Sequence, residues 1–217
     1  MRVRVWDLPT RLFHGALAIC FAGLVATGKS GGDWMRWHFL LGQAVLALLL
    51  FRLVWGWVGG YWSRFNRFLP KPLAALRYLK TPRSQPGHNP MGAFSVWAFL
   101  CLLLLQSFTG LISDDEIAST GPLSHLVSGS WVSRASSWHI GWGLNLLLTL
   151  VAIHLLAIIF YQFVKRQALV QAMVHGDQVH DGQYPASEDS LLSRLKAALI
   201  LLACALLVGG LVLRYGN

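Results

Sequence analysis

The sequence predicts an all-α integral membrane protein, built as a bundle of membrane-spanning helices. Hydrophobic residues make up 55% of the 217 residues and charged residues only 12%, whereas a soluble domain carries about 25% charged residues. The apolar residues gather in stretches of about 20, which is long enough to cross a bilayer. Many of the tryptophans lie near the ends of these stretches, as in the aromatic belts at membrane interfaces.

Five apolar stretches define the predicted helices. They cover about residues 8–27, 37–58, 89–112, 136–163 and 192–214. Asp7 precedes Pro9 at the first start, and Asn89 precedes Pro90 at the third; a capping side chain followed by an early proline is typical of a helix N-terminus. We expect residues 1–217 to form one membrane domain with a four-helix core over about 8–163, a loop over about 164–191 and an extra fifth helix.

The distribution of charge predicts how the bundle is oriented. The segment between the second and third helices carries six basic residues and no acidic one: Arg64, Arg67, Lys71, Arg77, Lys80 and Arg83. The loop between the third and fourth helices instead carries Asp114, Asp115 and Glu116. By the positive-inside rule the N-terminus, the basic segment and the loop at about 164–191 face the cytoplasm. The net charge of +9 therefore indicates topology and contact with lipid headgroups, and not a nucleic-acid partner.

Four histidines lie within or at the edges of the predicted spans: His14, His38, His139 and His154. An ionisable side chain in a membrane is expensive and is a candidate functional residue. His14 and His154 are expected near the cytoplasmic side, and His38 and His139 near the outer side. His139 and His154 are 15 residues apart in the fourth helix, which predicts that they lie about 22 Å apart along its axis and on broadly one face.

These two depth-matched pairs predict the axial ligands of two haems. The C-x-x-C-H sequence that attaches c-type haem covalently is absent, so each haem is expected to be b-type. Two histidines fill both axial positions of the iron, which leaves electron transfer as its chemistry. A different class of function, a haem-free transporter that binds substrate or ions through the histidines, stays open, although no internal repeat supports it.

Two further residues are candidates for contact with a haem. Gly42 lies one turn after His38, where the absence of a side chain would make room for a porphyrin; small residues are also common at any contact between membrane helices. Arg52 lies within the apolar second helix and could pair with a haem propionate, because arginine binds carboxylates in a bidentate manner. Snorkelling to the membrane interface is the competing explanation for Arg52.

The other histidines, His88, His125, His175 and His180, fall outside the apolar stretches. We expect them in turns and solvated loops. The short run from His175 to His180 lacks the helical spacing of a metal-binding pair, so a solvated loop is the simpler interpretation of it.

Several motifs resemble those of the prokaryotic cytochrome b561 family, which includes the b-type cytochrome subunits of nickel-iron hydrogenases. They are Trp6-Asp7-Leu8-Pro9-Thr10-Arg11-Leu12-Phe13-His14, Trp37-His38-Phe39-Leu40-Leu41-Gly42, Phe51-Arg52-Leu53-Val54-Trp55-Gly56, Gly87-His88-Asn89-Pro90-Met91-Gly92 and the helix from His139 to His154 that runs into Phe160-Tyr161. The match covers roughly the first four helices and continues into Val164-Lys165-Arg166.

The resemblance implies a diheme membrane cytochrome with one ligand from each of the first two helices and two from the fourth. It also implies exchange of electrons with quinone and a protein redox partner such as a hydrogenase, a reductase or a cytochrome c. The prediction is therefore an electron-transfer protein between quinone and that partner, with quinol or quinone oxidoreductase activity left open. The alternative use of the same cofactors is as the membrane anchor of a hydrogenase or another oxidoreductase complex.

Overall fold

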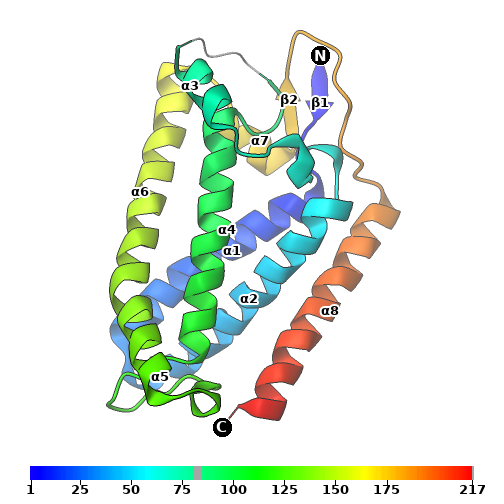
Figure 1. Cartoon of the computed structure of the whole chain (residues 1–217). Helices are drawn as coiled ribbons and strands as arrows, with labels where there is room; N and C mark the ends of the chain where they lie inside the picture. Colours follow the sequence, from blue (N-terminus) through cyan, green and yellow to red (C-terminus); the bar gives the residue numbers. More distant parts are fainter. Residues whose placement is uncertain (81–84, 217) are drawn as a thin grey trace. The chain divides into compact units, whose positions relative to one another are not determined.

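A computed structural model describes residues 1–80 and 85–216; Arg83 of the basic segment lies outside them. Within the described residues five helical stretches are long and apolar enough to cross a membrane (Figure 1). Four of them are the helices α1 (Leu8–Ser30), α2 (Met35–Val58), α4 (Pro90–Leu111) and α8 (Leu191–Tyr215). The fifth stretch, Gly129–Val164, is composite. The helical membrane architecture is therefore confirmed.

The composite stretch changes its helical geometry along its length. It begins with α5 (Gly129–Ser136), continues as a π-helical segment over Ser137–Gly143, becomes α6 (Leu144–Ile159) and ends in a second π-helical segment, Phe160–Val164. The predicted start near residue 136 was therefore late, because α5 is short and polar and gives no apolar signal. The assumption of one regular α-helix through His139 was also wrong.

Both predicted helix caps are confirmed. The Asp7 carboxylate accepts a hydrogen bond from the backbone N–H of Thr10 at 2.8 Å, at the first turn of α1. The Asn89 side chain accepts one from the backbone N–H of Gly92 at 2.7 Å, at the first turn of α4. Each cap satisfies an N–H group that has no partner within its helix.

The chain forms two compact units, and each long helix contributes a part to both. The first unit comprises Met1–Phe13, Arg52–Phe99 and Leu150–Ile200. The second comprises His14–Phe51, Leu100–Thr149 and Leu201–Asn217. These are groups of residues in mutual contact, and the expectation of one membrane domain stays a prediction.

The first unit contains a small antiparallel sheet that the sequence did not predict. Strand β1 (Arg2–Arg4) pairs with β2 (Asp177–Val179), so that Val3 lies opposite Gln178 (Figure 1). The short helix α7 (Leu169–His175) leads into β2. The carbonyl of Gly176, whose φ is 91°, accepts the N–H groups of Val5 and Trp6. The expected loop at about 164–191 is therefore partly ordered secondary structure.

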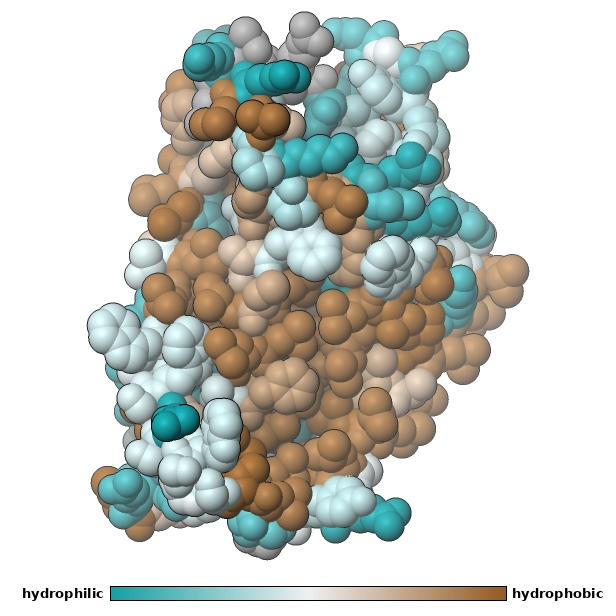
Figure 2. All heavy atoms as spheres, in the orientation of Figure 1, coloured by the Kyte–Doolittle hydropathy of each residue, from teal (hydrophilic) through white to brown (hydrophobic). Residues whose placement is uncertain are grey.

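In the second unit α2, α4 and α8 share an apolar core. Leu46 and Ala47 of α2 are buried with Val208 of α8, and Leu104 and Leu111 of α4 pack against them. Many other apolar side chains of the long helices are exposed, among them Ile19 at 74% and Leu213 at 88%, and such residues form the brown surface in Figure 2. Exposed leucines on helices of this length are expected to contact lipid.

Candidate functional site

Two of the predicted ligands come together within the second unit. His38 lies in the first turns of α2, and His139 lies in the π-helical segment Ser137–Gly143. The centroids of the two imidazole rings are 6.2 Å apart, and the ring planes are at 88° to each other. A metal ion bound to one nitrogen of each ring at about 2 Å would place the centroids roughly 6 Å apart. The spacing therefore fits a single metal centre between the two rings.

The hydrogen bonds of the two rings use Nδ1 and leave Nε2 of each ring available to bind a metal. The Nδ1 atom of His38 lies 3.0 Å from the carbonyl oxygen of Leu24, and Nδ1 of His139 lies 2.9 Å from the carbonyl oxygen of Gln106. A carbonyl only accepts hydrogen bonds, so each Nδ1 carries the proton and donates it. In each neutral ring the lone pair is then on Nε2, and the carbonyl fixes the ring orientation, as is usual for metal-bound histidines.

Both rings line a cavity of about 340 Å³, together with Gly28, Gly42 and Gly110. A Cβ atom added to Gly42 would meet no atom within 4 Å, so this glycine faces open space, and its role beside a porphyrin stays a prediction. The other two glycines instead touch the histidines. A Cβ on Gly110 would lie 2.6 Å from Cε1 of His139, and one on Gly28 would lie 3.0 Å from Cε1 of His38.

Gly28 and Gly110 were missed by the sequence reasoning. Each is one glycine within an apolar helix, and neither is adjacent to a histidine in the sequence. A close approach of this kind depends on how the helices pack, so only the fold reveals it. The absent side chains let α1 and α4 come close to the two imidazole rings.

His14 and His154, the ligands predicted for the second haem, belong to different units. His154 lies in α6 and belongs to the first unit, where the ring of Phe99 meets it edge-on with centroids 5.5 Å apart. His14 lies in α1 and belongs to the second unit. The pairing of His14 with His154 therefore stays a prediction.

Arg52 is buried in the first unit with only 3% of its surface exposed. One guanidinium nitrogen, Nη2, donates to the carbonyl of Ser63 at 3.0 Å, and the guanidinium lies 4.8 Å from the ring centroid of Phe65. The other terminal nitrogen, Nη1, is buried and has no hydrogen-bond partner among the described residues. This burial does not match a side chain that snorkels to water. Pairing with a propionate stays a prediction, and Nη1 is the nitrogen that could make it.

Asp7 of the N-terminal motif is the centre of a buried hydrogen-bond network. Its carboxylate is fully buried. Besides capping α1, it accepts a hydrogen bond from the indole N–H of Trp55 at 3.1 Å and one from the hydroxyl of Ser63 at 2.6 Å. The backbone carbonyl of Ser63 also accepts a hydrogen bond from Arg52. The Asp7 carboxylate therefore connects the start of α1, the end of α2 and the segment around Ser63, which binds the Arg52 guanidinium.

The four remaining histidines lie outside the five candidate spans. His88 is half-buried, with its ring 4.7 Å from that of Trp6 and 4.4 Å from that of Phe68, so it is a packing residue of the first unit and not a solvated one. His175 ends α7, and the ring of His180 packs against Tyr184. Over residues 1–80 and 85–216 no group of three or more His, Cys, Asp or Glu side chains could hold a metal ion.

Residues 5–176 match the sequence model of the family described as prokaryotic cytochrome b561. The chain belongs to this family. The resemblance seen in its motifs is thereby confirmed, and the chain is a membrane b-type cytochrome with haem b as its cofactor and electron transport as its chemistry. The residues around His38 and His139 fit a b-type haem, because the ring centroids have the spacing of one metal centre and the Nδ1 hydrogen bonds leave Nε2 of each imidazole available as a ligand.

The curated relatives in the cytochrome b561 family carry hydrogenase names. A probable Ni/Fe-hydrogenase B-type cytochrome subunit of Rhizobium leguminosarum bv. viciae is 23% identical over 215 residues, covering 82% of this chain and 89% of the relative. One from Azotobacter chroococcum mcd 1 is 26% identical, covering 80% and 87%. A probable Ni/Fe-hydrogenase 1 B-type cytochrome subunit of Escherichia coli K12 is 23% identical, covering 81% and 90%. No solved structure matches the chain.

Proposed function

We propose that this cytochrome carries electrons between quinone and a protein redox partner through two haems b, each held by two histidines. The observation that supports the proposal most directly is the pair His38 and His139, with ring centroids 6.2 Å apart and both Nδ1 atoms held by backbone carbonyls. A bound haem b would supply a one-electron carrier whose iron has no open position for a substrate. Electron transfer is the chemistry that remains.

The residues of the chain hold and orient such a carrier. Each carbonyl-bound Nδ1 makes its imidazole a more basic ligand and prevents the ring from turning. The apolar walls of the cavity, which include Val45, Leu46 and Leu147, exclude water and so tune the potential. We propose His14 and His154 as the ligands of the second haem, Arg52 as the partner of a propionate and Gly42 as the position that leaves room for a porphyrin.

The partner and the location belong to the same proposal. The relatives named above are hydrogenase subunits, so a hydrogenase is the first candidate partner, ahead of a reductase or a cytochrome c. The basic segment of Arg64, Arg67 and Lys71 and the acidic Asp114 and Asp115 support a multi-pass protein in the bacterial inner membrane with a cytoplasmic N-terminus. Membership of a b-type cytochrome family does not favour the haem-free transporter.

Haem content tests the ligand assignment. Purified wild-type protein should contain two haems b per polypeptide by pyridine haemochrome. His38→Ala and His139→Ala should each lose one haem of the two, and His154→Ala should lose the other. His125→Ala, at an exposed position outside the spans, is the matched control and should keep both. If His139→Ala kept both haems with an unchanged reduced-minus-oxidised spectrum, the assignment would be wrong.

The hydrogenase names of the relatives also favour a second role, that of membrane anchor for a larger complex. A complex with the partner that survives detergent extraction, with the free subunit inactive toward quinol, would support the anchor. A free subunit that quinol reduces rapidly would support the mobile carrier.

A further inference from the structure

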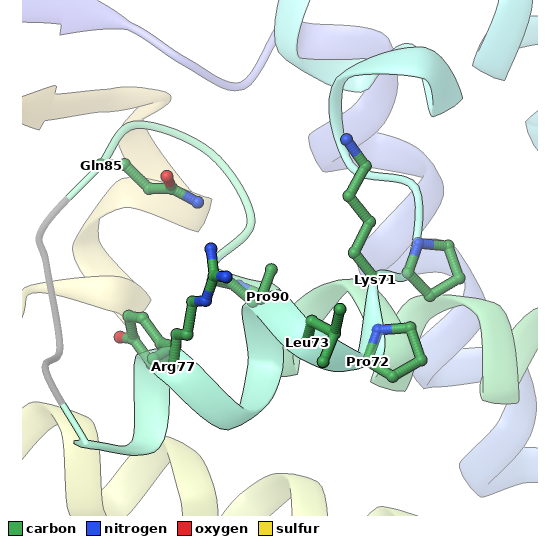
Figure 3. Close-up of a pocket in the computed structure, with 9 residues that line it drawn as sticks. Lys71, Pro72, Leu73, Arg77, Gln85 and Pro90 are labelled. Carbon is green, nitrogen blue, oxygen red and sulfur yellow. The ribbon is translucent and has the colours of Figure 1, made fainter.

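The first unit contains a large basic pocket that the electron-transfer function does not use. Its volume is about 770 Å³. It lies between the short helix α3 (Pro72–Lys80) and the residues that lead into α4. Figure 3 shows the side chains of Arg77 and Gln85 reaching into the space between these two segments, with Lys71 and Leu73 at the N-terminal end of α3.

The pocket borders the start of a candidate membrane span. Pro90, which lines it, is the first residue of the membrane-spanning helix α4. The segment that carries the pocket connects two spans, because α2 ends at Val58 and α4 begins at Pro90. The end of a membrane-spanning helix lies beside the lipid headgroups, so a pocket next to it is within reach of their phosphates.

The charges that line the pocket are positive. Lys71 and Arg77 both line it, and none of the described residues that line it is acidic. Residues 59–80 contain no acidic side chain. The start of α3 at Pro72 also faces the pocket, and a helix N-terminus favours an anion through its free N–H groups. The ligand should therefore be an anion.

Exposed leucines lie beside these cations. Leu73 lines the pocket and is 70% exposed, and Leu76, one turn further along α3, is 59% exposed. Ala75 and Tyr78 of the same helix are buried, and Tyr78 also lines the pocket, so α3 is held in the protein beside its exposed leucines. An amphipathic helix with leucines and basic residues on its outer side is typical of a segment lying in the membrane interface. The ligand should therefore be apolar as well as anionic.

We propose that this pocket binds the headgroup of an anionic phospholipid, with the phosphate against Lys71 and Arg77 and the acyl chains along Leu73. Basic pockets beside membrane helices on the cytoplasmic side bind such headgroups. The lipid would fix α3 to the membrane surface next to the start of α4. This inference does not depend on haem or on the redox partner.

The test measures lipid binding to the haem-loaded protein in detergent. Phosphatidylglycerol and phosphatidylcholine are titrated separately, and bound lipid is counted by native mass spectrometry. The wild type should retain phosphatidylglycerol selectively. Lys71→Gln and Arg77→Gln should each weaken its binding by about fivefold, the effect expected of one cation near an anionic headgroup. Lys80→Gln is the matched control, because it removes a charge from the same helix outside the pocket wall, and it should bind as the wild type does.

Three results would overturn the proposal. Equal weakening by Lys71→Gln and Lys80→Gln would mean general attraction to a basic surface and no defined site. Equal retention of the two lipids would mean that the headgroup charge is not recognised. Displacement of phosphatidylglycerol by millimolar inorganic phosphate, without any contribution of the acyl chains, would identify a phosphate site instead. Haem content of each variant verifies folding, and if Arg77→Gln fails to fold, the exposed Lys71 decides the question alone.

Discussion

Replacing Gly110 with alanine is expected to disturb the haem site proposed at His139 and to leave the proposed second site intact. The new Cβ would lie 2.6 Å from Cε1 of His139, where ordinary contact begins at 3.4 Å. The imidazole would have to retreat by about 0.8 Å, and the hydrogen bond from its Nδ1 to the carbonyl of Gln106, now 2.9 Å, would be strained or lost.

Overpacking of this kind costs about 1–3 kcal/mol, which corresponds to haem affinity lower by about 5- to 150-fold. Gly28→Ala should have a smaller effect, because its Cβ would lie 3.0 Å from Cε1 of His38. Gly209→Ala in α8 is the control, since its Cβ would meet no atom within 4 Å. Alanine favours the helix over glycine by about 0.5–1 kcal/mol at such sites, so the control should be as stable as the wild type or more so.

The assay is haem per polypeptide, followed by the rate at which haem transfers to excess apomyoglobin. We expect the rate to follow the order of the close contacts, fastest for Gly110→Ala, then Gly28→Ala, then Gly209→Ala, and only one of the two haems to be affected. The second haem is an internal control for global misfolding. The reasoning is refuted if Gly110→Ala keeps its haem as firmly as Gly209→Ala, because the orientation of His139 would then not govern binding.

Three further predictions concern stability. Asp7→Ala removes a helix cap and leaves buried donors without an acceptor, so the free energy of unfolding should fall by about 2–5 kcal/mol. Thermal denaturation measures the effect, and Asp181→Ala, at an exposed position, is the control that should show no change. Gln106→Leu removes the hydrogen bond that the Gln106 side chain donates to the backbone carbonyl of His139 at 2.8 Å. The thermal midpoint should fall slightly, because about 1 kcal/mol of stability is lost, and the haem content should not change. Loss of haem would instead mean that the Gln106 side chain, and not its backbone carbonyl, holds the His139 ring. Burial, with a hydrogen bond to Tyr161, raises the pKa of Tyr78 to about 12, so the folded state favours the neutral phenol. This stabilisation is complete below about pH 10, the pKa of tyrosine in the unfolded chain, and is lost as the pH rises toward 12. Tyr78→Phe should remove this part of the alkaline fall in the thermal midpoint, and an identical pH profile for the variant would contradict the assignment.

Features encoded by a local pattern were predictable from the sequence. The five spans follow from length and hydropathy, and the caps at Asp7 and Asn89 follow from residue types next to an early proline. His38 and His139 were candidates because imidazole is rare in apolar helices, and depth along the helices suggested that they could meet. Their rings do lie together in the second unit, while their ligation of haem stays a prediction.

Features that depend on contacts between distant residues were not predictable. Strand β1 pairs with a strand more than 170 residues away, since Arg4 lies opposite Asp177, and strands of three residues carry no usable periodicity. The contact between Arg52 and the Ser63 carbonyl likewise needs the chain to turn back on α2. The sequence indicated that Arg52 had a special environment, but it could not name the residues that form it.

The π-helical segment around His139 has a consequence for how this chain can change in length. Seven residues, Ser137–Gly143, follow the wider π pattern before α6 begins at Leu144. A wide turn of this kind holds about one residue more than an α-helical turn, so it can absorb an extra residue while the helix on either side stays in register. Deleting one residue between His139 and Leu144 should therefore return this stretch toward a regular α-helix without a large rotation of the flanking residues. We expect that homologous sequences lacking this residue carry a one-residue gap here, inside a membrane span, where gaps are otherwise unexpected.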